Sequence, residues 1–436
     1  MDAIWISVSI LFATLAVVQS ILVAAQAYEH RRFTRSRLRC LDSYRPQGKA
    51  ILFVPCRGRD LGLAQNLASL FEQDYEDYEI RFLVETPDDP VCRTIQRVAR
   101  QYPDRLSRMV FTGKATDCGQ KVHNLRHGTE RLSEDIKYLA FADSDARPRR
   151  HWLRALLHRL SNDRIGATTG YRWFVPMRTT TPNLLVTSVN ASFGMLLGSG
   201  NPNIIWGGSW AIRRDRFERL GIRQAWQRKL NDDVVVTDIM RQAGLRIEYE
   251  PACAVASPLN VSLAQMIDFA HRQYFQARYY LTRFWRAGLL FSTFSLMAFW
   301  MSLVAMMVMW RTGAALVWLP TFVAMTLYTS WAYRGLHRIW LSKELFPEYE
   351  RQLRTTRFLD VLGGPITALA NWLLFSTSAV GYRLVWREIH YELDGQGNVI
   401  TVRHKEGRPV ADSSSDQLRE SPPDSAEVSQ RMQRSP

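Results

Sequence analysis

The sequence predicts an α/β domain with a doubly wound, parallel sheet, together with transmembrane helices at its N-terminal and C-terminal ends. Two observations predict this class. Strand-like and helix-like segments alternate four times between residues 50 and 160, as they do in parallel sheets covered by helices. Four windows carry no charged residue and reach the ~20 residues that a membrane-spanning helix needs: 3–28, 287–310, 312–333 and 361–382.

The strands are predicted from short apolar runs. The first, "AILFVPC", is continuously apolar, as a strand buried on both faces should be. The predicted strands are 50–56, 78–85, 107–113 and 137–143, and the predicted helices are 61–73, 90–102, 121–132 and 151–160. Ligands of such sheets bind beyond the carboxyl ends of the strands. The second and fourth of these ends are acidic, reading "VETPDDP" and "FADSDARP".

Charge and cysteine content indicate a membrane protein with a cytoplasmic domain. The formal charge of +15 is concentrated in short basic runs beside apolar windows, which favours membrane flanks over nucleic-acid binding. The first window has no basic segment before it and no clear cleavage site, so we interpret it as a retained anchor. The stretch "EHRRFTRSRLR" after it holds five arginines, and the positive-inside rule then places the domain in the cytoplasm. The five cysteines form no CxxC pair, which fits a reducing compartment without disulfides or zinc.

These features divide the chain into five parts. We expect an N-terminal anchor at 1–28, a cytoplasmic domain at 29–265, an interfacial aromatic and basic segment at 266–286, three transmembrane segments within 287–382, and an extension at 383–436 that is largely disordered after 405. Four crossings would put the C-terminus outside, whereas Arg383 and Arg387 after the last window favour the inside. Either one window does not fully span or the charge rule fails here.

Asp143 and Asp145 raise the question of a metal site. Residues i and i+2 of a strand point the same way, so both carboxylates can project beyond the strand end. Mg²⁺ typically takes one or two carboxylates plus substrate phosphates. The alternative is a solvated turn, or ion pairs to the arginines at 147, 149 and 150. The motif alone does not decide between them.

Three further stretches bear on the decision. "NDDVVVTDI" places Asp232 and Asp233 at the start of a helix, where acidic residues can also be ordinary caps. "IIWGGSW", which contains Trp206, is a glycine turn that can bring the backbone close to a ligand or can be only a turn. "FAHRQYFQARYY" has the mixture of arginines and aromatics of an interfacial helix, and its arginines could also hold a diphosphate. For Arg283 and Arg286, which follow it, we favour membrane anchoring.

Taken in order, these motifs resemble the ceramide glucosyltransferase branch of the processive-type, family 2-like glycosyltransferases. The matching stretches are "VPCRGRD", "LFEQDYEDYEIRFLVETPDDP", "GQKVHNL", "FADSDARP", "IIWGGSWAIRRDRFERLGI", "NDDVVVTDI" and "FAHRQYFQARYY". The resemblance runs from the anchor to about residue 390. It implies a glycosyltransferase A-type fold and inversion at the anomeric carbon of a nucleotide sugar.

The resemblance also implies roles for particular residues. Asp233 matches the catalytic base, and Asp145 matches the carboxylate that holds Mg²⁺ or Mn²⁺. Donor binding is implied for Asp89, Asp143, Lys121, Asn124 and Arg272. Further candidates are Glu85, Asp232, Gln273, Gln276 and Trp206. Three positions depart from the pattern: Phe269 replaces the first polar residue of the last motif, Gln273 stands where relatives have tryptophan after the arginine, and Glu85 stands where many have Asp or Gln.

The chemistry gives a reason for these residue types. Displacing a nucleoside diphosphate builds negative charge on the leaving group, which a cation held by Asp145 and the Arg272 guanidinium can stabilise. The acceptor hydroxyl loses a proton as it attacks, and a carboxylate can accept it. We expect transfer of glucose from UDP-glucose to a lipid alcohol such as ceramide, with no nucleic-acid partner, in a bacterial inner membrane rather than a Golgi-like one. The alternatives are a polysaccharide synthase of the cellulose or hyaluronan type and a non-catalytic membrane scaffold.

Overall fold

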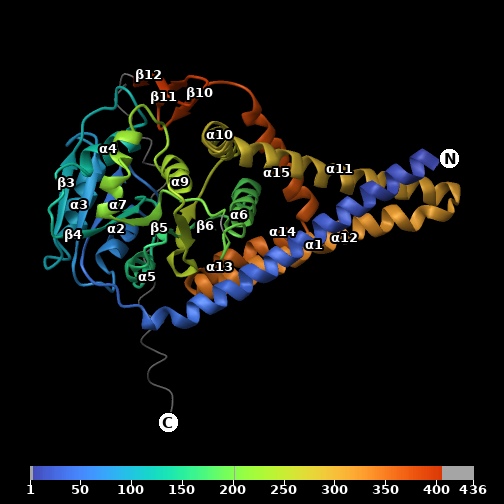
Figure 1. Ribbon diagram of the computed structural model, residues 1–436, viewed down its shortest axis with the longest axis horizontal. Helices are drawn as coiled ribbons and strands as arrows, with labels where there is room; N and C mark the ends of the chain where they lie inside the picture. The colour runs from blue at the N-terminus through green and yellow to red at the C-terminus, as the bar shows by residue number, and fades with distance from the viewer. Residues whose placement is uncertain (1–2, 201, 405–436) are drawn as a thin grey trace, which may run out of the picture.

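The computed structural model describes residues 3–200 and 202–404. In Figure 1 a rounded α/β body lies beside an elongated bundle of apolar helices, with β10–β12 on top of the body. The strands are β1 Lys49–Cys56, β2 Tyr78–Val84, β3 Ser107–Phe111, β4 Ile136–Ala142, β5 Ile165–Thr169, β6 Arg172–Pro176, β7 Ser209–Arg213, β8 Arg246–Tyr249, β9 Val255–Leu259, β10 Arg383–Trp386, β11 Ile389–Leu393 and β12 Val399–His404.

The helices are distributed over the body and the bundle. In the body they are α2 Leu63–Phe71, α3 Val91–Ala99, α4 Gln120–Gly128, α5 Trp152–His158, α6 Thr181–Gly194, α7 Arg214–Arg219, α8 Ile222–Ala225, α9 Asp233–Gln242 and α10 Leu263–Tyr280. The others are α1 Ala3–Cys40, α11 Thr282–Thr312, α12 Trp318–Leu345, α13 Glu350–Leu353, α14 Arg357–Val361 and α15 Gly364–Ser376.

A seven-stranded sheet forms the centre of the body, in the order β3-β2-β1-β4-β7-β5-β8. The four predicted βα units are confirmed, and β1 pairs in parallel with both β2 and β4. The sheet is not parallel throughout, because β7 runs antiparallel to β4 and to β5. The α/β class with apolar helices at both ends is confirmed.

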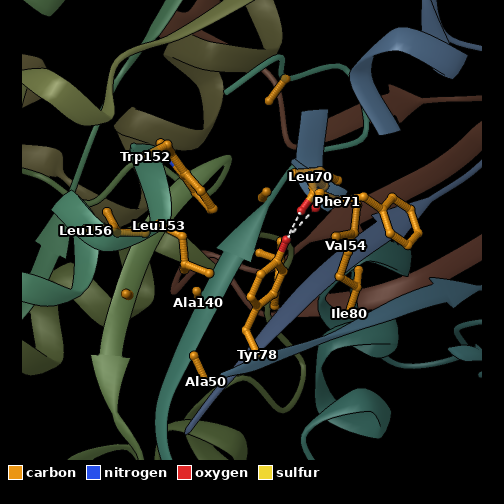
Figure 2. Packing of buried hydrophobic residues seen from close by; sticks show 14 of the residues in the cluster. Ala50, Val54, Leu70, Phe71, Tyr78, Ile80, Ala140, Trp152, Leu153 and Leu156 are labelled. Carbon is orange, nitrogen blue, oxygen red and sulfur yellow. Dashed lines mark hydrogen bonds between the residues drawn. The ribbon is translucent and has the colours of Figure 1, made fainter. Parts of the chain in front are cut away.

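The sheet is buried on both faces, as the continuously apolar first strand predicted. Along β1, Ala50, Leu52 and Val54 face a core with α2, α3 and α5, while Ile51 and Phe53 face a second core with α4, α7 and α9. This is the alternation that strand geometry requires. In the first core the Tyr78 hydroxyl donates hydrogen bonds to two α2 carbonyls, at 2.8 and 3.0 Å, which satisfies its one polar atom (Figure 2).

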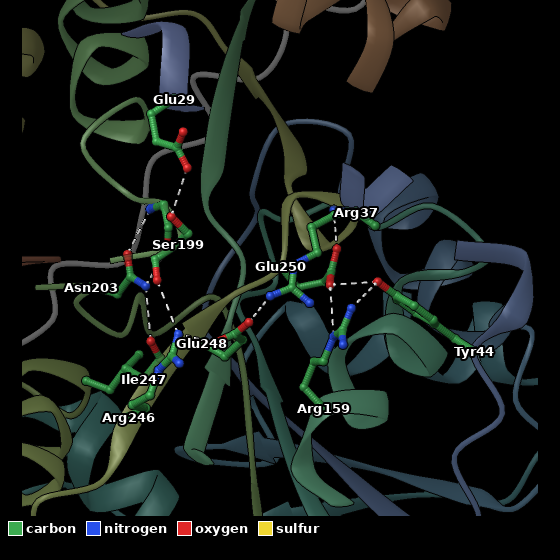
Figure 3. A network of polar contacts seen from close by, with 12 residues as sticks. Glu29, Arg37, Tyr44, Arg159, Ser199, Asn203, Arg246, Ile247, Glu248 and Glu250 are labelled. Atoms are coloured by element: carbon green, nitrogen blue, oxygen red, sulfur yellow. Dashed lines mark hydrogen bonds and ion pairs between the residues drawn. The ribbon is translucent and has the colours of Figure 1, made fainter. Parts of the chain in front are cut away.

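The N-terminal helix extends beyond the predicted anchor. α1 continues past residue 28, through the arginine-rich stretch, to Cys40. Its last turns dock onto β8 through an ion pair of Arg37 with Glu248. Beside it, the Tyr44 hydroxyl donates to the buried Glu250 carboxylate at 3.2 Å, and Arg159 lies on the same carboxylate (Figure 3). The anchor is therefore joined rigidly to the sheet.

Three helices are long and apolar enough to cross a membrane, by length and composition: Ser7–Ser43, Thr282–Thr312 and Ala315–Leu345. The fourth predicted window differs. Its helix, α15, has 13 residues, which at 1.5 Å per residue is about 20 Å and too short for a ~30 Å hydrocarbon core. It forms a bent pair, at 92°, with the segment before it.

Both ends of α15 are held on the side of the α/β body. Before it, Asp360 accepts hydrogen bonds from Ser188 of α6 at 2.8 Å and from Arg338 at 2.9 Å. After it, the Ser378 carbonyl accepts one from Arg278 of α10 at 2.7 Å. Within 287–382, two helices are therefore long enough to cross a membrane on their own, and the last window could cross one only together with the segment before it. If that window turns back instead, Arg383 and Arg387 lie on the same side of the membrane as the body.

Residues 383–404 form a three-stranded antiparallel sheet, β10-β11-β12, which the sequence analysis did not predict. The expected disorder after residue 405 lies outside the described residues. The segment at 266–286, expected to be interfacial, forms α10 and the start of α11, and α10 buries Met266, Ala270, Tyr274 and Phe275 against the body.

Candidate active site

Four segments bring their ends together at the carboxyl edge of β4, next to the antiparallel strand β7. Asp143 and Asp145 follow β4, and the Trp206–Ser209 turn leads into β7. Lys121 lies in the first turn of α4, while Asp232 and Asp233 form the start of α9. This is the edge at which ligands bind to α/β sheets.

Lys121 is the centre of this cluster. Its ammonium lies 2.8 Å from an oxygen of Asp143 and 3.3 Å from one of Asp232, and it donates to the Gly207 carbonyl at 3.3 Å. The Gly207 amide in turn donates to Asp233 at 2.5 Å. One cation thus joins the end of β4, the glycine turn and the start of α9. Sequence analysis named Lys121 as a donor-site residue, and the structure gives it a second role in holding the carboxylates together.

The protonation of the cluster follows from burial and from this one cation. Burial alone would raise the pKa of Asp143, but the Lys121 ammonium outweighs it and the net shift is downward. Burial raises the pKa of Asp232 to about 7 despite Lys121, and it raises the pKa of Asp233 above its ordinary value in the same way. Burial opposes the charge on Lys121, yet the three carboxylates together raise its pKa. The site therefore contains carboxylates with a graded affinity for protons.

The two glycines of the turn are required by close approach. A Cβ on Gly207 would lie 2.7 Å from the Lys121 nitrogen and 2.8 Å from an oxygen of Asp232. A Cβ on Gly208 would overlap the Trp206 ring and lie 2.7 Å from an oxygen of Asp143. The turn can lie against the carboxylates only because these residues lack side chains.

Asp145 has the features of a ligand for a divalent cation. Its side chain is 33% exposed, one oxygen pairs with Arg172 at 3.3 Å, and the other is buried without a hydrogen-bond partner in the described part of the chain. Burial, with repulsion from Asp143, raises its pKa although Arg172 opposes this. A hard cation takes oxygen ligands of this kind, with phosphates completing its shell, so the residues present fit Mg²⁺ or Mn²⁺.

A second group of possible metal ligands lies close together elsewhere in the chain, but its surroundings do not suit a metal ion. Within residues 3–200 and 202–404, three ligand atoms approach within 4.8 Å of one another at Asp117, Cys118 and His123. The Arg126 guanidinium lies 3.6 Å from Asp117 and 3.9 Å from the Cys118 sulfur. Since the Arg126 guanidinium already contacts two of these three residues, we assign no metal ion to them.

Four candidates from α10 and the glycine turn have different positions. Arg272 lies over the ring of Phe269 at 5.3 Å, and burial, together with the nearby Arg172, lowers its pKa to about 10. Arg172 also lies over the Trp206 ring at 5.3 Å, which places Trp206 at the site. Gln276 is buried and accepts a hydrogen bond from Asn231 at 2.9 Å. Gln273 is exposed on α10.

The other candidates lie after β2 and in α4. The Asp89 carboxylate accepts hydrogen bonds from the Gly58 and Val91 amides, each at 2.9 Å, so it fixes the loop after β1. Glu85 is buried and lies 3.6 Å from Arg57. Asn124 accepts from Thr112 and from Gln120, each at 2.8 Å. These three residues support the loops beside the cluster and do not touch its carboxylates in this structure.

Sequence reasoning missed Arg172 and Asp60. Arg172 begins β6 and pairs with Asp145. Asp60 accepts a hydrogen bond at 2.6 Å from Ser144, the residue between the two aspartates. Asp60 lay inside the matching stretch "VPCRGRD", which was a signal. Arg172 had none, because only the fold brings β6 beside β4.

Asp145 lines a cavity of about 130 Å³ together with two arginines and seven apolar residues. Its charged residues are Asp145, Arg172 and Arg272, and its apolar residues are Phe174, Val186, Pro258, Leu259, Val261, Met266 and Phe269. The carboxylate proposed for the metal therefore borders an apolar space between α6, β9 and α10.

Comparison with known proteins identifies the family. The model of glycosyl transferase family 21 matches residues 11–399. The chain belongs to this family. It is therefore a glycosyltransferase, and its three long apolar helices make it a membrane protein.

Curated relatives match over shorter segments. Ceramide glucosyltransferase 3 of Caenorhabditis elegans is 26% identical over 74 residues, which is 17% of this chain and 16% of that protein. Ceramide glucosyltransferase 1 of the same organism is 27% identical over 71 residues, 16% of this chain and 15% of that protein. The matched segments thus span less than a fifth of either relative.

Solved structures of glycosyltransferases resemble this chain with low TM-scores. A mannosyltransferase from Pyrobaculum calidifontis, in complex with GDP-Man and Mn²⁺, has a TM-score of 0.41 and 17% identity over 82% of this chain and 99% of that chain. Glucosyl-3-phosphoglycerate synthase from Mycobacterium tuberculosis has a TM-score of 0.34 and 13% identity over 55% of this chain and 81% of that chain.

Proposed function

We propose that this protein transfers a single sugar, glucose from UDP-glucose, to a lipid alcohol such as ceramide, with inversion at the anomeric carbon. The observation that carries the proposal is that Asp145, two residues from Asp143 of the cluster, lines a cavity with apolar side chains. Asp145 and Arg272 line that cavity together with Phe174, Val186 and Met266. A lipid alcohol can enter an apolar space with its hydroxyl toward the polar end, whereas a growing polysaccharide would need a hydrated groove.

In this proposal the acceptor hydroxyl attacks the anomeric carbon as the bond from that carbon to the diphosphate breaks. The nucleoside diphosphate leaves with the electron pair, and the hydroxyl proton passes to Asp233. Asp233 suits this role because burial raises its pKa, and the amides of Gly207 and Val234 fix the orientation of its carboxylate. Each of its oxygens keeps a further lone pair to receive a proton.

The positive groups around the site suit the leaving diphosphate. Arg272 carries a buried nitrogen without a hydrogen-bond partner among the described residues, and so does Arg172. Asp145 would hold Mg²⁺ or Mn²⁺, which would stabilise the charge that develops on the diphosphate. Asp143, kept ionised by Lys121, and Asp89 would contact the nucleoside.

The proposal includes the side of the membrane on which the α/β body lies. The five arginines of "EHRRFTRSRLR" directly follow the apolar part of α1, and they favour a cytoplasmic α/β body. A bacterial inner membrane fits this arrangement. The basic side of the bundle would also attract anionic lipid headgroups.

The test is a screen of nucleotide sugars against a total lipid extract. Membranes that contain the protein are incubated with each labelled nucleotide sugar and Mg²⁺ or Mn²⁺, and the products are divided between organic and aqueous phases. We expect label from UDP-glucose in an organic-extractable lipid. Label found only in a high-mass, water-soluble polymer would favour a polysaccharide synthase. Nucleotide binding without turnover on any lipid would favour a scaffold.

A further inference from the structure

The C-terminal sheet β10–β12 packs across the loops that surround the candidate active site. The Tyr391 hydroxyl accepts a hydrogen bond at 3.1 Å from the Gln120 amide, next to Lys121. On the other side, the Val399 amide donates at 2.7 Å to the Arg228 carbonyl, shortly before Asp232. One small sheet thus contacts both segments that supply the central ion pair.

The turn of the β10–β11 hairpin has an uncommon backbone. Trp386 pairs with Ile389, which leaves Arg387 and Glu388 as a two-residue turn. Both have positive φ, 47° and 65°. Turns of this type favour Asn and Gly, because side chains with a Cβ are disfavoured there. Retaining an arginine at this position suggests that its side chain has a use, since strained residues gather at functional sites.

The side chain of Arg387 points to the acidic side of the site. It donates to an oxygen of Asp60 at 2.8 Å and to the Arg57 carbonyl. The other oxygen of Asp60 accepts from Ser144 at 2.6 Å, between the two aspartates of the candidate metal site. The guanidinium is 41% exposed, so it is free to approach a ligand.

Trp386 stands beside the other cation of the site. Its ring lies 4.9 Å from the guanidinium carbon of Arg272, on which Phe269 also packs at 5.3 Å. The residue after Arg272 is the exposed Gln273, which offers no aromatic ring. The hairpin therefore supplies an aromatic face to Arg272 from a distant part of the chain, and such a face orients a planar guanidinium.

We propose that the β10–β11 hairpin is part of the donor site, with Arg387 as a ligand of the nucleotide sugar's diphosphate and Trp386 as the positioning residue for Arg272. This inference rests on the proposed function, because the diphosphate is that of its donor. In the structure Arg387 is held by Asp60, and binding exchanges that carboxylate for phosphate oxygens. The hairpin would recognise the diphosphate group of a nucleoside diphosphate and not its base.

The test measures binding of UDP and GDP, each against its nucleoside, to the purified full chain by calorimetry. The variants are Arg387→Ala, and Arg387→Asn with Glu388→Gly, which gives the hairpin a favoured turn sequence. Both should weaken diphosphate binding about tenfold or more, as for a lost hydrogen bond to a charged group, and leave nucleoside binding unchanged. Arg383→Ala is the matched control, because Arg383 begins strand β10 of the same hairpin and pairs with Glu392 at 3.5 Å.

Each outcome is decisive. Wild-type protein that binds neither diphosphate overturns the proposed function and this inference together. Wild-type binding that survives in both Arg387 variants overturns the inference alone, and so does an equal loss for the diphosphate and the nucleoside, since that is a structural effect. For Trp386, we expect Trp386→Phe to retain diphosphate binding and Trp386→Leu to weaken it at an unchanged melting temperature. Equal binding by these two variants overturns the positioning role.

Discussion

Replacing Lys121 by methionine removes the cation that holds the site together while nearly keeping the length of the side chain. The Lys121 ammonium is 15% exposed and lies within 3.3 Å of both Asp143 and Asp232. Breaking a buried ion pair by removing one partner costs about 3–5 kcal/mol. Because Asp143 is 24% exposed and Asp232 can take up a proton, the lower end, about 3 kcal/mol near pH 8, is appropriate.

The loss should depend on pH, with a definite sign. The pKa of Asp232 is already about 7 with Lys121 in place, and without that cation the pKa values of both carboxyl groups rise in the folded state. The folded variant then binds more protons than the unfolded chain, whose carboxyl groups titrate near ~3.9. Stability therefore falls as the pH rises through this interval and returns on acidification. The variant should be most destabilised near pH 8 and much less near about pH 5.5.

The assay is thermal unfolding of the purified protein in detergent at about pH 5.5 and about pH 8. A loss of about 3 kcal/mol lowers the midpoint by about 6–12 °C for a domain of this size. Lys114→Met is the control, since Lys114 is exposed in the loop before α4, seven residues earlier, and its midpoint should match wild type at both pH values. An equal decrease for Lys121→Met at the two pH values, or no decrease, refutes the reasoning.

Three other variants test separate parts of the structure. Burial raises the pKa of Glu250 to about 7 against the opposing charges of Arg37 and Arg159, so wild type should lose stability from about pH 4.5 to about pH 7. Glu250→Gln should flatten this slope of the melting temperature, and an unchanged slope would contradict the assignment. Gly208→Ala, whose Cβ would meet Trp206 and Asp143, should reduce the rate of sugar transfer at least about tenfold, which corresponds to about 1.4 kcal/mol or more of lost transition-state stabilisation. Gly198→Ala is the control and should keep the wild-type rate, because there is open space around Gly198. Cys40 is exposed and the other four cysteines are buried, so Cys40→Ser should abolish fast maleimide labelling; fast labelling that persists would show that a buried cysteine is accessible.

The sequence predicted the elements whose apolar pattern is local. The first four strands and helices were found because each has its own run of buried residues. The acidic ends of β2 and β4 were recognised because they directly follow such runs. The antiparallel insertion of β7 could not be read, because strand direction depends on which neighbours pair. The short helix in the last apolar window could not be foreseen, because composition does not show that Asp360 and Ser378 are both tied to the body.

The candidate site was predicted as separate motifs, and their assembly was not. Asp143, Lys121, Asp232 and Asp233 were each named, but their sharing of one ammonium depends on contacts between segments up to 111 residues apart. Arg172 and the hairpin residues Trp386 and Arg387 were missed as site residues for that reason. The alternation in "RLVWREIHYEL" was a signal for β10 and β11, whereas nothing in the sequence links Trp386 to Arg272.

The most direct test of the central claim compares Asp233→Asn with Asp238→Asn, which lies exposed on the same helix. Both proteins are incubated with UDP-glucose, a divalent cation and total lipid, and the extracted lipids are analysed by mass spectrometry. The account predicts a lipid heavier by one hexose from wild type and from Asp238→Asn. It predicts almost none from Asp233→Asn, although that variant still binds UDP. Equal product from Asp233→Asn would contradict the assignment of this cluster as the site of glycosyl transfer.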